Sequence, residues 1–99
     1  MDDLWWRDQD ADNIRRRNER YPGAVGTEPE WALEAANDPH RIVRNPDPKS
    51  RSAAIRIIGY SPSAGCVVTV IATRSDHAGA TAWQTSGADL RAYDAQESP

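Results

Sequence analysis

The sequence predicts a single α+β domain whose second half folds as an antiparallel sheet. Its 99 residues suit one domain with one modest core. The segments expected to be helical come before a run of segments rich in Ile and Val, an order typical of α+β proteins. The two clearest strands, residues 53–60 and 66–74, are separated by only five residues, which is a hairpin length.

The N-terminal part is expected to contain a short strand and a helix. Within residues 1–9, the apolar run Leu4-Trp5-Trp6 can pair as an edge strand. Residues 10–20 are expected to form a helix, because Asp10 or Asp12 can cap it and place negative charge at its positive end. Proline and glycine within residues 21–26 then mark a loop.

A second helix is expected to begin at Thr27. Thr27 as the N-cap and Glu30 three residues later form a capping box, and Pro29 is tolerated in the first turn. The helix is expected to end near Asn37-Asp38-Pro39, because a residue that precedes proline disfavours the helical conformation.

The rest of the chain is expected to form a meander of strands and a last helix. Residues 40–44 suit a short strand before a proline-bounded loop, and residues 79–84 suit the last strand. Residues 88–96 are expected to form a short C-terminal helix. Residues 97–99 are expected to be a frayed tail.

Composition excludes several classes of protein. The single cysteine, Cys66, rules out an intramolecular disulfide and a cysteine-based zinc site. His40 and His77 lie far apart in the sequence, so we expect no metal site and no cofactor. No apolar stretch reaches the ~18 residues of a membrane span, and the N-terminus lacks the features of a signal peptide. A cytoplasmic location is therefore expected.

Positive charge is concentrated in the middle of the chain. The overall net charge of -3 argues against a general nucleic-acid binder, but residues 40–74 carry five Arg and one Lys against one Asp. Arg41, Arg44, Lys49 and Arg51 surround the proline-bounded loop. This arrangement suits contact with phosphates or with an acidic partner, and it is equally consistent with a solvated surface.

Two residues of the expected sheet are further candidates. Strand alternation puts Arg56 on the same face as Ile58 and Tyr60, where an arginine must reach water, an acid or a ligand such as phosphate. Trp83 can stack on a nucleobase, although a tryptophan in a sheet is more often part of the core. The residues alone leave these alternatives open.

Several short segments follow one another in an ordered series along the chain. They are Trp5-Trp6, Asn13 in the first helix, Glu34-Ala35-Ala36-Asn37-Asp38-Pro39, Ile57-Ile58-Gly59-Tyr60-Ser61 with Gly65, the strand 67–73, Thr81-Ala82-Trp83, and Asp89-Leu90-Arg91-Ala92-Tyr93. In their order and spacing, these segments resemble the BrnT family of toxins from bacterial type II toxin–antitoxin pairs. The resemblance covers nearly the whole chain.

The resemblance implies a fold, an activity and a partner. The fold is RelE-like: an α+β domain with a curved antiparallel sheet, two N-terminal helices packed on it and a short C-terminal helix. The activity is cleavage of RNA, which inhibits growth. The partner is a cognate antitoxin, usually a small ribbon-helix-helix DNA-binding protein, and operator DNA is reached only through it.

The resemblance also implies site residues. Arg56 and Arg74 would hold the scissile phosphate, and Arg91 and Tyr93 match the family's last helix. Tyr93 would be the proton donor, with His77 a weaker alternative. The residues expected to bind RNA are Arg41, Arg44, Lys49, Arg51, Trp83 and Gln84.

One segment departs from the family pattern. The family's final strand usually carries a basic pair after alanine, whereas Ala82 is followed here by Trp83-Gln84. The catalytic cation would then have to come from Arg56, Arg74 or Arg91. Two hypotheses follow: a ribonuclease toxin neutralised by its antitoxin, and a catalytically silent relative that acts through its protein partner as an interaction module or corepressor.

Overall fold

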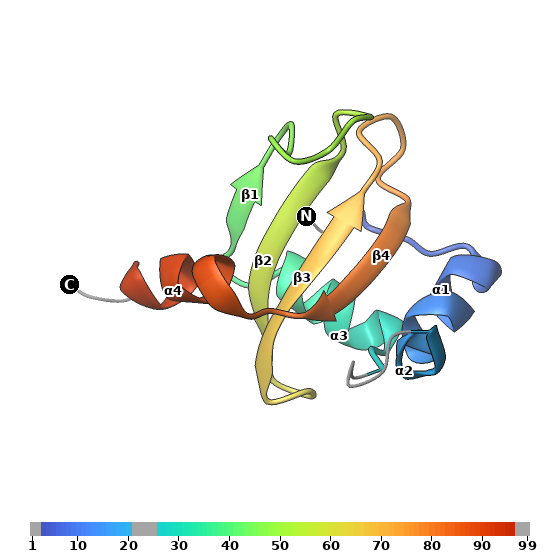
Figure 1. The fold of residues 1–99 in the computed structure, drawn as a ribbon, viewed down its shortest axis with the longest axis horizontal. Coiled ribbons are helices and arrows are strands. Elements are labelled where there is room, and N and C mark those ends of the chain that lie inside the picture. The colour runs from blue at the N-terminus through green and yellow to red at the C-terminus, as the bar shows by residue number, and fades with distance from the viewer. Residues whose placement is uncertain (1–2, 21–25, 97–99) are drawn as a thin grey trace.

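The computed structural model describes residues 3–20 and 26–96 as an α+β fold (Figure 1). The four strands form one antiparallel sheet in the order β1-β2-β3-β4, so each strand pairs with its neighbour in the sequence. The predicted α+β class and antiparallel sheet are confirmed. The elements are α1 (Asp8–Arg15), α2 (Arg17–Arg20), α3 (Pro29–Ala36), β1 (Ile42–Arg44), β2 (Ile55–Ser61), β3 (Cys66–Ala72), β4 (Gly79–Gln84) and α4 (Gly87–Ala95).

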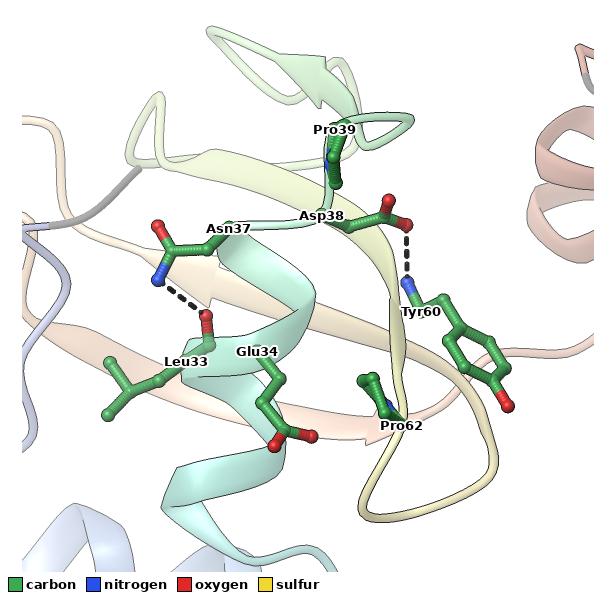
Figure 2. Close-up of a pocket in the computed structure, with 7 residues that line it drawn as sticks. All are labelled: Leu33, Glu34, Asn37, Asp38, Pro39, Tyr60 and Pro62. Atoms are coloured by element: carbon green, nitrogen blue, oxygen red, sulfur yellow. Dashed lines mark hydrogen bonds between the residues drawn. The ribbon is translucent and has the colours of Figure 1, made fainter.

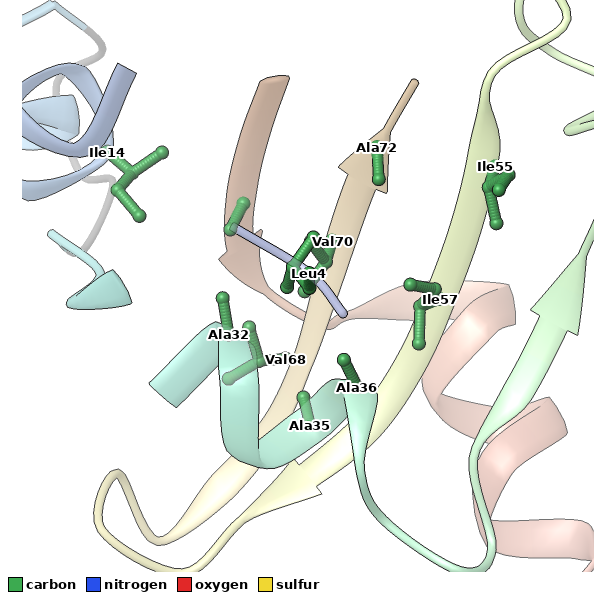
Figure 3. Packing of buried hydrophobic residues seen from close by; sticks show 11 residues of the cluster. Leu4, Ile14, Ala32, Ala35, Ala36, Ile55, Ile57, Val68, Val70 and Ala72 are labelled. Carbon is green, nitrogen blue, oxygen red and sulfur yellow. The ribbon is translucent and has the colours of Figure 1, made fainter. Parts of the chain in front are cut away.

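Helix α3 covers one face of the sheet, and the main core lies between them (Figure 3). The helix turns three alanines inward, and β2 and β3 supply branched side chains such as Ile57 and Val70, both fully buried. Small residues on a helix let it approach the sheet closely, and burial of branched aliphatic side chains contributes most of the stabilisation. The core cluster consists of Leu4, Ile14, Ala32, Ala35, Ala36, Ile55, Ile57, Val68, Val70, Ala72 and Ala82.

Gly59 sets the distance between α3 and β2. A Cβ atom at Gly59 would lie 2.0 Å from the main-chain oxygen of Ala35, a separation that no packed structure tolerates. The strand can therefore pass this point of α3 only with a residue that has no side chain. The same approach brings the end of α3 beside the β2–β3 hairpin, where the groove described below is formed.

Helix α4 lies against the opposite face of the sheet and covers only one end of it (Figure 1). Tyr93 of α4 packs with Ile58 of β2 and Val67 of β3, and Ile42 and Leu90 join this smaller cluster. The rest of this face carries Arg56 and Trp83, and the guanidinium group of Arg17 in α2 lies over the Trp83 ring. The two faces of the sheet are therefore unequal, because one holds the core and the other holds the polar side chains.

The N-terminal segment lies along the β4 edge of the sheet. Trp5 forms an isolated parallel bridge with Ala78: its N–H donates to the carbonyl of His77 over 3.3 Å, and its carbonyl accepts from the N–H of Gly79 over 2.7 Å. The expected edge strand is thus reduced to one bridge. A Cβ atom at Gly79 would lie 2.5 Å from the ring of Trp6, so this glycine makes room for the indole.

Three local predictions are wrong at their boundaries. The helix expected over residues 10–20 begins at Asp8 and is interrupted at Arg16, whose φ of -98° and ψ of 18° leave the helical region. Thr27 is not the N-cap of α3: Glu28 is, without a side-chain cap, while the N–H of Thr27 donates to the carbonyl of Ile14 over 2.8 Å.

The third wrong boundary is the end of β3. This strand stops at Ala72, because the Thr73 hydroxyl donates to the Asp76 carboxylate and the Thr73 N–H donates to the carbonyl of Ala78, which closes a turn. Arg74 therefore lies in that turn and not in the sheet.

Some predictions fall on residues outside the described ranges. They concern residues 1–2 of the N-terminal segment, residues 21–25 of the expected loop, and the tail 97–99. Among the helices of residues 3–20 and 26–96, none combines the length and the apolar character that a bilayer crossing requires.

Candidate functional site on the polar face of the sheet

Arg56 is the centre of a buried ion-pair network. Its Nε atom lies 3.1 Å from Oδ2 of Asp47, and its Nη1 atom donates to Oδ2 of Asp89 over 3.0 Å. The other carboxylate oxygen of Asp89 accepts from Nη1 of Arg44 over 2.9 Å. Arg56 is only 8% exposed. Its guanidinium group is therefore occupied by two acids of the protein itself.

The contact between Arg56 and Asp47 is an ion pair more than a hydrogen bond. The Nε–H direction misses the carboxylate oxygen, so this buried nitrogen has no aligned acceptor although the two charges are 3.1 Å apart. Coulomb attraction does not need that alignment, and at this distance in a desolvated setting it dominates. We therefore treat Asp47 as a partner of Arg56.

Each of the two acids is also stabilised within its own segment of the chain. Asp47 lies in the loop between β1 and β2, where its N–H donates to the carbonyl of Ala54 over 2.7 Å and its Oδ1 accepts from the N–H of Lys49 over 3.1 Å. Asp89 lies in the first turn of α4, where a negative charge complements the helix dipole. The network thus joins β1, β2, a loop and α4.

Trp83 lies beside this network on β4. The guanidinium groups of Arg17 and Arg56 lie over its ring, 5.3 Å and 5.4 Å from the centroid. Nη1 of Arg17 also donates to the Thr81 hydroxyl over 3.4 Å. The π surface of the indole is therefore already in contact with two cations of the protein, and these cation–π interactions stabilise the fold.

Tyr93 forms a second buried polar cluster under α4. Its hydroxyl donates to Oδ2 of Asp38, which also accepts from the N–H of Tyr60 over 2.8 Å, while Oδ1 accepts from the N–H of His40 over 2.9 Å. Burial raises the pKa of the Asp38 carboxyl, but the bonds from Tyr93, Tyr60 and His40 outweigh it and hold that pKa below its ordinary value. Asp38 is thus an ionised acceptor that anchors Tyr93.

The four residues expected to catalyse do not meet at one point. Arg56 is enclosed by acids, and Tyr93 is 3% exposed and bound to Asp38. Arg91 is exposed, because it lies two positions before Tyr93 and a helix turns about 200° over that spacing. Arg74 is exposed in the β3–β4 turn. The candidate proton donor is therefore buried, whereas two of the candidate cations are exposed.

The residues expected to bind RNA separate into two groups. Arg41, Lys49 and Arg51 are exposed, and they flank β1 on both sides in the sequence. Gln84 is exposed at the end of β4, where it lines a cavity of about 240 Å³ together with Trp31 and Cys66. Arg44 and Trp83 are the internal contacts described above. The exposed cations thus gather around β1 and its following loop.

A groove that the sequence did not indicate lies between the end of α3 and the β2–β3 hairpin (Figure 2). Its volume is about 420 Å³. Tyr60 is 41% exposed at its rim. Two of the residues that line the groove are prolines, Pro39 and Pro62, and prolines in a sequence indicate turns and not a groove. The groove is lined by Leu33, Glu34, Asn37, Asp38, Pro39, Tyr60 and Pro62.

The acids of this groove are satisfied by the protein. Glu34 accepts from the Ser63 hydroxyl over 2.7 Å, from the Ser61 hydroxyl over 2.7 Å and from the Ser63 N–H over 2.9 Å. These bonds hold the pKa of Glu34 below its ordinary value. Since Asp38 is also fully engaged, neither carboxylate is positioned as a general base, and the groove offers mainly an apolar surface.

In the part of the chain that the structure describes, no group of three or more His, Cys, Asp and Glu side chains is placed to hold a metal ion.

No protein-family model, no curated protein and no solved structure matches the chain.

Proposed function

We propose that this chain is a BrnT-like, RelE-like member of a type II toxin–antitoxin pair in the cytoplasm, and that it acts by binding its protein partner and not by cutting RNA. The observation that carries the second part is the enclosure of Arg56 by Asp47 and Asp89. A guanidinium already neutralised by two acids of the protein cannot also hold the negative charge that develops on a scissile phosphate.

The position of Tyr93 supports the same conclusion. A proton donor must reach the leaving oxygen within hydrogen-bond distance. The Tyr93 hydroxyl is buried and donates to Asp38. Together with the replacement of the family's basic pair by Trp83-Gln84, this arrangement favours the silent relative, whose partner is expected to be a small ribbon-helix-helix or other DNA-binding protein.

The test is expression of the chain alone and beside the neighbouring small reading frame. We expect normal growth and intact total RNA when the folded chain is expressed alone, and co-purification of the two proteins when both are expressed. If the neighbouring product does not bind the chain, the partner-binding function is wrong.

An RNA-cleaving toxin is the second candidate, and the exposed cations favour it. Lys49, Arg51 and Arg74 are exposed and could contact a phosphate backbone. Arg41 is also exposed, although its Nη1 donates to the carbonyl of Asp38 over 3.1 Å. Growth arrest with loss of RNA, reversed by the neighbouring product, would support this candidate over the first.

A further inference from the structure

The two edges of the sheet differ in how they are protected. Strand β4 pairs with β3 and is flanked by the Trp5 bridge, and α1 packs against it. Strand β1 pairs only with β2, and within residues 3–20 and 26–96 no other strand or bridge joins its outer side. An unprotected edge presents unpaired N–H and C=O groups, which can pair with an added strand.

An exposed apolar side chain lies on this open edge. Val43, the central residue of β1, is 46% exposed. It is paired with Ile57, a core residue, so it projects on the side of the sheet that carries α3. An added strand would cover Val43 and continue the apolar surface of the core by one strand, which is the usual source of side-chain specificity in strand addition.

The exposed charged side chains next to β1 in the sequence are all positive. Arg41 precedes the strand, Lys49 and Arg51 follow it, and all three side chains are exposed. The only acid between residues 40 and 51 is Asp47, which is 4% exposed and faces Arg56 inside the sheet. Asp47 therefore neutralises an internal charge and leaves the outward charge of this edge positive.

We propose that the outer edge of β1 binds an extended acidic segment of the partner protein as a fifth strand of the sheet. This inference rests on the proposed function and identifies the chemistry of the partner. Main-chain bonds to β1 would hold the segment, an apolar side chain would cover Val43, and acidic side chains would face the cations on either side of the strand.

The first test uses a short synthetic peptide that alternates Glu with Val, titrated against the full chain. Hydrogen exchange in the complex should slow at the amides of residues 42–44. The same peptide methylated at alternate backbone nitrogens keeps its charge but cannot pair as a strand, and it should bind about tenfold more weakly. Equal affinity of the two peptides overturns the proposal.

The second test separates the edge from general electrostatics. Arg51→Glu should weaken binding of the unmethylated peptide about threefold or more, whereas Arg16→Glu, the same change at an exposed residue between α1 and α2, should leave it unchanged. Equal effects of the two variants overturn the proposal. If the neighbouring product binds the chain but slows exchange outside β1, the edge assignment is wrong while the partner-binding function stands.

Discussion

Arg56 is the residue at which the ribonuclease and the partner-binding hypotheses diverge. The alternation of β2 correctly put its side chain on the face of Ile58 and required a water molecule, an acid or a ligand for its charge. The structure supplies two acids. Because Asp47 and Asp89 come from a loop and from a helix far along the chain, sequence spacing could not indicate that they converge on Arg56.

The network makes a stability prediction for Arg56. Arg56→Leu leaves Asp47 buried without its counter-charge, so we expect the free energy of unfolding to fall by about 3–5 kcal/mol. Urea denaturation measures this change. Arg74→Leu, which removes an exposed cation from a turn, should change stability by less than ~0.5 kcal/mol. Equal losses in the two variants would contradict the structural role of Arg56.

The carboxyls of Asp38 and Glu34 make stability depend on pH. Their pKa values in the fold lie below the ordinary 3.8 and 4.5, so each group stabilises the fold above its ordinary pKa. That stabilisation is lost as pH falls through the lower pKa of the folded state. Stability should therefore decline steeply below about pH 4.

Substitutions at Asp38 and Glu34 test whether these two carboxyls cause the loss of stability at low pH. Asp38→Asn or Glu34→Gln should flatten the fall in unfolding free energy on the acid side. Asp94→Asn, which removes an exposed carboxyl of α4, is the matched control for the loss of one negative charge. Unfolding curves recorded between about pH 5 and about pH 2 give the comparison. An unaltered slope in both test variants would contradict the assignment.

At the scale of elements, the central strands were predictable, and the starts of the first two predicted helices were not. Runs of Ile and Val with a five-residue connection indicated β2 and β3, because burial in a sheet leaves a local signature. Thr27 had every local feature of an N-cap, but its N–H pairs with Ile14 of α1, and this contact between elements overrides the local preference. Such contacts are invisible in a short sequence window.

The close approach of α3 to β2 predicts that adding a side chain at Gly59 destabilises the fold. Gly59→Ala places a methyl group 2.0 Å from the Ala35 carbonyl oxygen, so α3 must move and the melting temperature should drop markedly, with a loss of about 3 kcal/mol. Gly65→Ala is the matched control in the adjoining hairpin. Its φ of 70° costs an alanine about 1 kcal/mol, and nothing lies within 4 Å of the new Cβ.

Thermal unfolding followed by far-ultraviolet circular dichroism compares the two glycine variants directly. If Gly59→Ala is no less stable than Gly65→Ala, then α3 does not pack on β2 at this point.

At the scale of the whole molecule, the two faces of the sheet carry different kinds of side chain: one is mainly apolar, and the other holds most of the buried ion pairs. Helices α3 and α4 lie on opposite faces of the sheet (Figure 1). The main core lies on the α3 face, and the ion pairs of Arg56 lie on the α4 face. Three exposed cations, Arg41, Lys49 and Arg51, flank β1, and others are exposed at Arg74 in a turn and at Arg91 in α4. The sequence located the charge next to β1 in residues 40–74, but only the topology joined it to an open strand edge.

The sequence therefore predicted which residues form the candidate site, but it did not predict which residues they contact. Arginines, Trp83 and Tyr93 were all singled out from the chain. Their partners were not, because each is paired with an element distant in sequence: Arg56 with Asp89, Trp83 with Arg17, and Tyr93 with Asp38. Each pairing joins residues far apart in the sequence, so a short sequence window could not indicate it.

The most direct test of partner binding without catalysis is incubation of the purified, folded chain with total RNA, followed by mapping of new RNA ends. The enclosed Arg56 and the buried Tyr93 predict RNA that stays intact. The decisive comparison is with Arg56→Lys and Tyr93→Phe, each checked for folding by circular dichroism. Cleavage by the unaltered chain that both folded variants abolish would contradict the account and establish a ribonuclease.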